Sequence, residues 1–312
     1  MINNDDVTVL SAPLVLAVVL AGCSSGSSGP STGQLSLSVS DGPVHDAIEV
    51  CLEFDEIEIK KAGSPPETIT GLALQQVNLL EFQGPNAAPL FTDVTVEAGD
   101  YDWVRIGVNA TLGGSGGMGS PLPDSVGCSY GGSYVLFEDE PNTPYNAYVP
   151  SGAQTGLKIN SKFVVAQGGL TSMTAEFDLQ KTLTEPPGLD GNIVVRPSIT
   201  LVNDLEVGTV TGSVSADLAE AEGCVPSVFA FADGDEVMDP ANSITSAVVS
   251  DDDNPGVYSY AIGFLYAGES ETGVPYDLAF TCDGGTTYSG GTGDVTIVAG
   301  ETETLDFPVP GT

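Results

Sequence analysis

The sequence predicts an all-β protein built from two β-sandwich domains. Segments in which apolar and polar residues alternate recur along most of the chain, and this period of two is typical of half-buried strands. Turns that contain Gly and Pro separate these segments, and the chain holds 39 Gly and 21 Pro. The hydrophobic fraction of 41% indicates a folded chain rather than a disordered one.

The amino terminus has the pattern of a secretory signal. Residues 7–20 are almost entirely apolar, and Leu20-Ala21-Gly22-Cys23 reads as a lipobox. Cleavage at such a motif makes the Cys the new amino terminus, where several acyl chains hold a protein to a lipid bilayer. We therefore expect 1–22 to be a lipoprotein signal peptide, although residues 1–6 lack the usual Lys or Arg. An uncleaved anchor or a buried strand is the alternative.

Residues 23–33 are mostly Ser and Gly, the composition of a flexible tether. Ser24 follows the lipobox Cys and resembles the residue that lets lipoproteins pass to the outer membrane. We therefore expect a lipid-anchored protein of the cell envelope, at the outer membrane, on its periplasmic or its surface face.

The charge excludes two classes of partner and indicates a domain boundary. With 7 Lys and Arg against 43 Asp and Glu, the chain is too acidic to bind nucleic acid or an anionic membrane surface through charge. All the basic residues precede position 205, whereas acidic residues continue to the end. We expect one domain over 34–204 and an acidic second domain over 205–312.

The cysteines divide evenly across this boundary. Apart from Cys23, the first domain holds Cys51 and Cys128, and the second holds Cys224 and Cys282. Only one of the three possible pairings keeps both bridges within domains, so it predicts Cys51–Cys128 and Cys224–Cys282. An exported compartment permits such bonds. A metal site is the rival interpretation, but the chain has no C-x-x-C pair and one His.

The first domain begins with a strand over 34–40. In the next strand, residues 48–54 place apolar side chains on one face, and Cys51 is on the other face. The alternation then slips by one residue, which predicts a β-bulge near Asp55-Glu56. We expect the partner of Cys51 to come from a covering loop, namely the Gly-rich segment that leads to Cys128.

Residues 71–82 have spacing compatible with one or two helical turns. Residues 97–108 predict a strand with Val104, Ile106 and Val108 on one face and Tyr101, Trp103 and Arg105 on the other. Gly168-Gly169 predicts a hairpin turn. Further strands are predicted at 134–137, 145–149, 157–166, 170–179 and 192–202.

Five short motifs occur in a characteristic order between residues 34 and 203. They are Leu35-Ser36-Leu37-Ser38-Val39-Ser40-Asp41-Gly42-Pro43, Val77-Asn78-Leu79-Leu80-Glu81-Phe82, Ala98-Gly99-Asp100-Tyr101 with Val104-Arg105-Ile106, Phe177-Asp178-Leu179 with Lys181, and Arg196-Pro197-Ser198-Ile199. This order resembles the bacterial lipoprotein family called domain of unknown function 4382. The resemblance implies a β-rich, surface-tethered protein.

In the second domain, strand patterns occur at 208–214, 254–262, 276–282 and 295–302. This order resembles the prealbumin-like or carboxypeptidase-regulatory type of Ig-like, seven-stranded sandwich, in which a Gly-x-Tyr precedes a strand and a closing strand follows a Gly-Glu-Thr turn, here Gly300-Glu301-Thr302. Modules of this type are usually spacers or binders, so the resemblance implies a binding or spacing role.

Several residues are candidates for catalysis or binding, and for each we favour a structural role. Gly113-Gly114-Ser115-Gly116-Gly117 matches a nucleophile elbow, but lies in a Gly-rich loop, and His45 is the one possible imidazole base. Tyr101 and Trp103 could stack on sugars or pack within a sandwich. Acidic residues in two short runs are calcium candidates, but their spacing favours solvated turns. These residues are Asp233, Asp235, Glu236, Asp251, Asp252 and Asp253.

Without a catalytic constellation, the sequence predicts a non-enzymatic binding or assembly module that needs no cofactor. Its expected partners are the bilayer, through acylated Cys23, and an envelope protein or glycan. A carbohydrate-binding surface module and a hydrolase that uses acidic residues are the alternatives.

Overall fold

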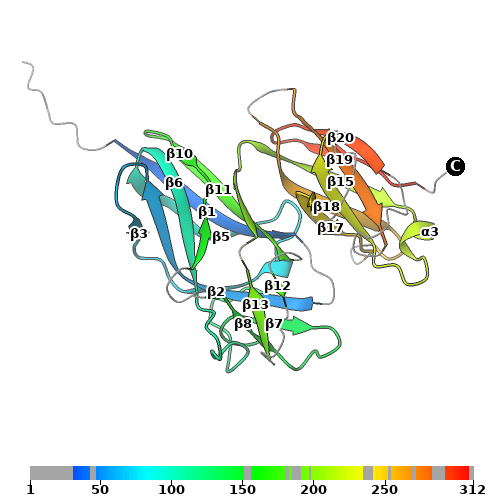
Figure 1. The fold of residues 1–312 in the computed structure, drawn as a ribbon, viewed down its shortest axis with the longest axis horizontal. Helices are drawn as coiled ribbons and strands as arrows, with labels where there is room; N and C mark the ends of the chain where they lie inside the picture. Colours follow the sequence, from blue (N-terminus) through cyan, green and yellow to red (C-terminus); the bar gives the residue numbers. More distant parts are fainter. Residues whose placement is uncertain are drawn as a thin grey trace, which may run out of the picture. The chain divides into compact units, whose positions relative to one another are not determined.

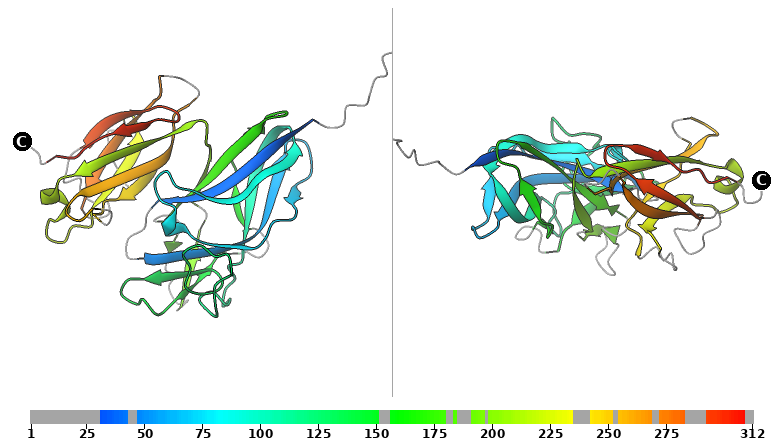
Figure 2. Two further views of the ribbon diagram at one scale, coloured as in Figure 1. Left: turned by 180° about the vertical axis from the view of Figure 1, so that it is seen from behind. Right: turned by 90° about the horizontal axis from the view of Figure 1, so that it is seen from above.

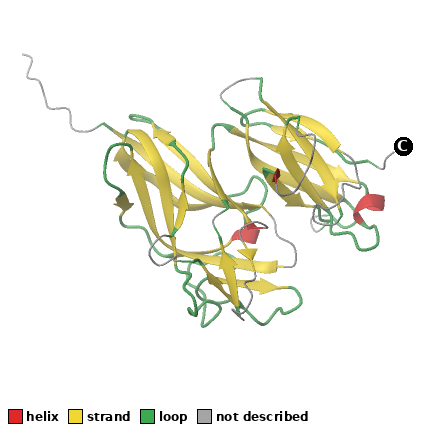
Figure 3. Cartoon of the chain, viewed as in Figure 1, coloured by secondary structure: helices red, strands yellow, loops and turns green. Residues whose placement is uncertain are grey.

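A computed structural model (Figure 1) describes residues 31–42, 47–150, 156–179, 183–184, 191–196, 198–234, 242–251, 254–268, 272–282 and 292–308. In these residues the regular secondary structure is almost entirely strand, as the sequence predicts, and the helical segments are short (Figure 3). All of them belong to one compact unit, Ser31–Thr312.

The first sandwich contains a four-stranded sheet in which β1 (Thr32–Gly42) lies between β5 (Ala88–Glu97) and β11 (Leu170–Asp178). β1 pairs antiparallel with β5 and parallel with β11, and the three strands run side by side in Figures 1 and 2. The order of the strands is β14 (Ile199–Asn203), β11 (Leu170–Asp178), β1 (Thr32–Gly42) and β5 (Ala88–Glu97).

The second sheet of this sandwich has ten strands. The main path is β10 (Phe163–Val165), β6 (Gly99–Val108), β2 (Ala47–Lys61), β7 (Tyr134–Phe137), β8 (Tyr145–Tyr148), β13 (Asn192–Val195) and β12 (Leu183–Thr184). β3 (Glu67–Ile69) and β4 (Gln75–Asn78) also pair with β2, and β9 (Leu157–Ile159) pairs with β6. Apolar side chains of both sheets form one core.

The bulge predicted in β2 is confirmed. Against β6, the register shifts between Phe54 and Ile57, and both Asp55 and Glu56 are exposed. Because the extra residue restores the phase, Phe54 and Ile57 both face the core, where they are 4% and 2% exposed.

A second irregularity overturns the predicted position of Tyr101. The register between β2 and β6 also shifts where Lys60 pairs with Trp103 and Lys61 pairs with Tyr101. This shift at Asp102 turns Tyr101 to the face opposite Trp103, so its ring is buried and stacks on Phe163 with 5.0 Å between centroids.

Four predicted segments differ in sheet or conformation in the structure. The Gly168-Gly169 turn is not a hairpin, because β10 belongs to the ten-stranded sheet and β11 to the four-stranded one. The predicted strands 157–166 and 192–202 are each divided in two, and β13 and β14 lie in different sheets. Residues 75–78 form β4, so the expected helical turns reduce to the 3-10 helix η1 (Leu79–Glu81).

The second sandwich has its own pair of sheets and its own core. A three-stranded sheet has the order β18 (Tyr258–Tyr266), β15 (Val207–Val214) and β21 (Thr302–Thr304). A second four-stranded sheet has the order β17 (Thr245–Val248), β16 (Ser227–Ala232), β19 (Val274–Thr281) and β20 (Thr292–Ile297). Helix α3 (Ala216–Ala219) follows β15. Among the described strands, none of residues 32–203 pairs with one of 207–304.

Candidate functional site

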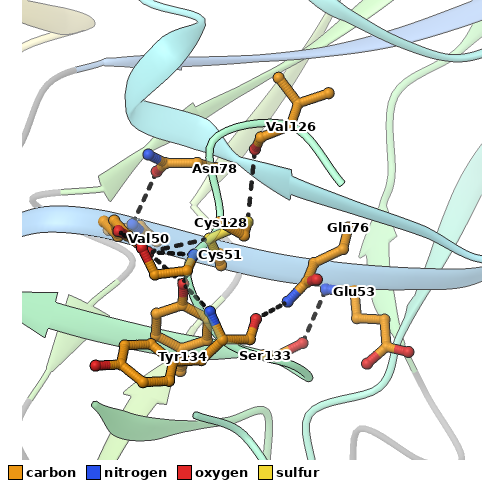
Figure 4. The surroundings of a disulfide bond; sticks show 12 residues. Val50, Cys51, Glu53, Gln76, Asn78, Val126, Cys128, Ser133 and Tyr134 are labelled. Carbon is orange, nitrogen blue, oxygen red and sulfur yellow. Dashed lines mark hydrogen bonds between the residues drawn. A yellow bond between two sulfur atoms is a disulfide. The ribbon is translucent and has the colours of Figure 1, made fainter. Parts of the chain in front are cut away.

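The loop between β6 and β7, residues 109–133, is fastened to the outer face of β2 by a disulfide (Figure 4). Cys51 points away from the main core and bonds to Cys128, with 6.0 Å between the Cα atoms. Together with Tyr134 and Leu136 they form a separate apolar cluster. The predicted pairing and the predicted covering loop are both present in the structure.

Tyr134 holds the same loop through its buried hydroxyl. The oxygen accepts hydrogen bonds from the amides of Ser129, at 2.8 Å, and Tyr130, at 3.1 Å, and the hydroxyl donates to the Glu49 carboxylate. Glu49 also accepts from the Ser129 hydroxyl at 2.6 Å. Burial raises the pKa of Tyr134, and its hydrogen bond to Glu49 adds to this, so the phenol stays neutral and remains a donor.

Gln76 also holds the 109–133 loop in place, and the sequence alone does not identify it. Its fully buried amide group donates 2.7 Å hydrogen bonds to the carbonyls of Tyr130 and Gly132 and accepts one from the Leu122 amide at 3.0 Å. One β4 side chain thereby satisfies three backbone groups of the loop. No local sequence pattern at Gln76 could predict these contacts, because its carbonyl partners lie 54 and 56 positions further along the chain.

The glycines around Ser115 serve close packing. A Cβ on Gly116 would lie 1.9 Å from the Ser133 carbonyl oxygen, so only Gly allows the two segments to approach. The Ser115 carbonyl accepts from the Met118 amide at 3.0 Å within a loop, not at a strand-to-helix turn. His45 lies outside the described residues.

The second predicted disulfide is also present. Cys224 and Cys282 are bonded with 4.4 Å between their Cα atoms, and both pack against the core of the second sandwich. The Val225 amide donates to the Cys282 carbonyl at 2.6 Å, which continues the contact beyond the bridge.

The calcium candidates are only partly described. Asp251 accepts from the Gly256 amide at 2.8 Å in a turn, and Asp233 is exposed. Asp235, Glu236, Asp252 and Asp253 lie outside the described residues. In the described part of the chain, no group of three or more His, Cys, Asp or Glu side chains is arranged to hold a metal ion.

Trp103, the remaining aromatic candidate, already has a cation over its ring. The Lys158 ammonium lies 4.5 Å from the ring centroid, a cation–π contact that occupies one face of the indole. Tyr101, buried against Phe163, donates its hydroxyl to the Glu97 carbonyl at 2.8 Å. The two candidates therefore do not form a shared platform.

Asp41 is a buried carboxyl group without a hydrogen-bond partner among the described residues. It is 2% exposed, and no described donor approaches either of its oxygens with the geometry of a full hydrogen bond. Burial, followed by the nearby carboxylates of Asp178 and Glu176, raises its pKa well above the ordinary value, and the Leu179 amide opposes this only in part. The group sits at the end of β1 and indicates a stability effect rather than a reaction.

The proposed acylation residue, Cys23, lies outside the described residues. Within the described ranges, the structure has no helix with the length and apolar character needed to cross a bilayer.

Comparison with known proteins gives structural likeness at low identity. The chain is similar to the Bacillus anthracis TIE protein (8% identity, TM-score 0.20, covering 88% of this chain and 33% of that one), so it spans about a third of that protein. It is also similar to a candidate cell adhesion protein of Bacteroides fragilis, with 11% identity and a TM-score of 0.21, covering 88% of this chain and 91% of that one. A third similar structure is GBS52, the minor pilin of Streptococcus agalactiae, with 12% identity and a TM-score of 0.20, covering 89% of this chain and 98% of that one.

No curated protein matches the chain. The family model described as Domain of unknown function (DUF4382) matches residues 32–197, which comprise the strands of the first sandwich up to β13. That range is more than half of the chain. It contains four of the five motifs that carried the resemblance and the first two residues of the fifth. The protein belongs to the DUF4382 family.

Proposed function

We propose that this protein is a lipid-anchored, non-enzymatic binding module of the cell envelope. Its two sandwiches would stand outside the cytoplasm on the 23–33 tether, with the acyl chains of Cys23 in the bilayer. The outer membrane is the proposed location, because Ser rather than Asp follows the lipobox Cys.

The allocation of the five cysteines carries this proposal. Four of them form two disulfides, each within one sandwich, and the fifth is Cys23 of the lipobox. Disulfides persist in oxidising compartments outside the cytoplasm, and a thiol left over in an exported chain needs its own explanation. Acylation of Cys23 supplies one, and it agrees with the apolar run before it.

Binding rather than turnover is supported by how the polar groups are used. The Tyr134, Glu49 and Gln76 side chains are committed to holding the covering loop, and Ser115 belongs to a segment whose glycines serve close packing. In the described part of the chain, these contacts give structural roles to Tyr134, Glu49, Gln76 and the segment around Ser115.

Metabolic labelling with an alkyne analogue of palmitate tests the anchor. We expect label on the wild-type chain and none on Cys23→Ser, with the unlabelled variant moving from the membrane fraction to the soluble extracytoplasmic fraction. Ser24→Ala is the matched control and should keep the label. Equal labelling of Cys23→Ser, or a wild-type chain found in the cytosol with all thiols reduced, would refute the proposal.

Cross-linking on intact cells tests the binding role. We expect the wild-type chain to form discrete adducts with envelope components, whereas a purified chain that turns over ester or glycoside substrates would instead support the hydrolase alternative. Such turnover would count as enzymatic only if it fell on substitution of a named acidic residue or of Ser115.

A further inference from the structure

The outer face of the three-stranded sheet carries a row of short hydroxyl side chains. On β15, Val210 and Val214 enter the core, so Thr211 and Ser213 lie on the opposite face. The register places Ser213 beside Ser259 of β18 and Thr211 beside Thr304 of β21. Residues of three strands, distant in sequence, thereby form one hydroxyl face.

This hydroxyl face forms the floor of a groove of about 610 Å³. Its walls include Gln83 and Asn86 of the turn before β5, and Ser250 after β17. The volume lies within the range of about 300–1,000 Å³ that small-molecule sites occupy. A groove of this size can hold two or three sugar rings rather than a folded protein domain.

Several hydrogen-bonding groups in the groove are free to meet a ligand. Among the described residues, the side chains of Gln83, Ser250, Ser259 and Thr304 form no hydrogen bond. Together they offer an amide and three hydroxyls, each able both to donate and to accept. The many hydroxyls of a sugar have the same dual capacity.

The one charged group in the lining is Asp306. Its Oδ1 accepts from the Ser213 amide at 2.7 Å and from the Ser213 hydroxyl at 2.8 Å, and these bonds lower the pKa of Asp306. The carboxylate is therefore ionised at neutral pH, with Oδ2 left as a strong acceptor. No lining residue is basic, so the groove offers nothing to an anionic ligand.

We propose that this groove binds a neutral polysaccharide, with Gln83, Ser259, Thr304 and Asp306 as its hydrogen-bonding residues. This deepens the proposed function by naming a ligand class for the binding module. It also places sugar binding at the outer face of the three-stranded sheet and the turn before β5, rather than at Trp103, whose ring carries Lys158.

Affinity electrophoresis of the purified full chain in gels containing dextran, mannan, xylan or dextran sulfate tests the proposal. We expect at least one neutral polymer to retard the wild type and dextran sulfate to have no effect. In the Ser259→Ala/Thr304→Val double variant, we expect the dissociation constant for that polymer to rise about tenfold or more, as for the loss of two hydrogen bonds. Thr302→Val is the matched control, since Thr302 lies on the same strand and face but outside the groove.

Three results would contradict the proposal that the groove binds a neutral polysaccharide. Retardation by dextran sulfate alone, no retardation by any neutral polymer, or equal retardation of the wild type and the double variant would each refute the groove. Gln83→Leu, on a separate element, should weaken binding in the same way and serves if the double variant fails to fold. None of these outcomes alters the palmitate labelling of Cys23, so the groove and the anchor fail independently.

Discussion

Removal of the Cys51–Cys128 bond should cost the first sandwich about 4 kcal/mol. The bond joins residues separated by 77 positions, and cross-linking a loop of that length lowers the free energy of folding by about 4.5 kcal/mol through the unfolded chain. Cys51 is fully buried in an apolar cluster, so Ala is the suitable replacement, because a Ser hydroxyl there would lack a partner. The variant is Cys51→Ala/Cys128→Ala.

The chain contains one Trp, at position 103 in β6, so its fluorescence reports the first sandwich. In urea, we expect the double variant to lower the free energy of unfolding seen by Trp103 by about 4 kcal/mol. Cys224→Ala/Cys282→Ala is the control for the second sandwich and should shift the Trp103 transition much less. A loss below about 1 kcal/mol in the first variant would refute the loop-entropy reasoning. Equal shifts in both variants would show that the two sandwiches unfold as one unit.

Three further changes probe single groups. Asp41→Asn should raise the free energy of unfolding in urea at pH 7 but not at pH 3. Burial raises the pKa of Asp41 in the folded state above its pKa in the unfolded chain. The contribution of Asp41 to stability is therefore complete below the unfolded-state pKa and is lost as the pH rises through the folded-state pKa. Gln76→Ala should cost about 2–4 kcal/mol, because it leaves three backbone groups of the loop, including the Leu122 amide, without partners; a loss under about 0.5 kcal/mol would contradict the role given to this amide. Gly116→Ala should lower the melting temperature by several degrees, because its Cβ would meet the Ser133 carbonyl, whereas Ser115→Ala should leave it unchanged; equal effects would show that the loop yields to the extra atom.

Local patterns were sufficient to predict the class of fold, both disulfides and the bulge in β2. That bulge was visible because Asp55 and Glu56 are two polar residues in succession, which breaks the alternation openly. The bulge at Asp102 was not visible, because Tyr101 is amphipathic and its alternation with Trp103 continues without a break. Only the pairing with β2 reveals that Tyr101 has turned to the core.

Site residues were harder to predict, because their partners lie far away in the chain. The carbonyl groups that Gln76 holds are 54 and 56 positions further on. Ser213 and Asp306 are separated by 93 positions and meet only because β21 joins β15 in parallel. Sequence periodicity locates a strand and its faces, whereas the strands that lie beside it depend on the tertiary fold.

The distribution of charge restricts what this molecule can bind. Against a formal net charge of −36, several of the few basic groups are used internally: Lys61 pairs with Glu97 at 2.8 Å, Arg105 with Glu58, and Lys158 covers Trp103. Such partly exposed pairs add little stability, but they engage cations that could otherwise attract an anionic ligand. At physiological salt, repulsion between the chain and other anions extends about 8 Å. The charge therefore favours neutral or cationic partners, and the free amide and hydroxyl groups of the groove are the reason for proposing a neutral polysaccharide.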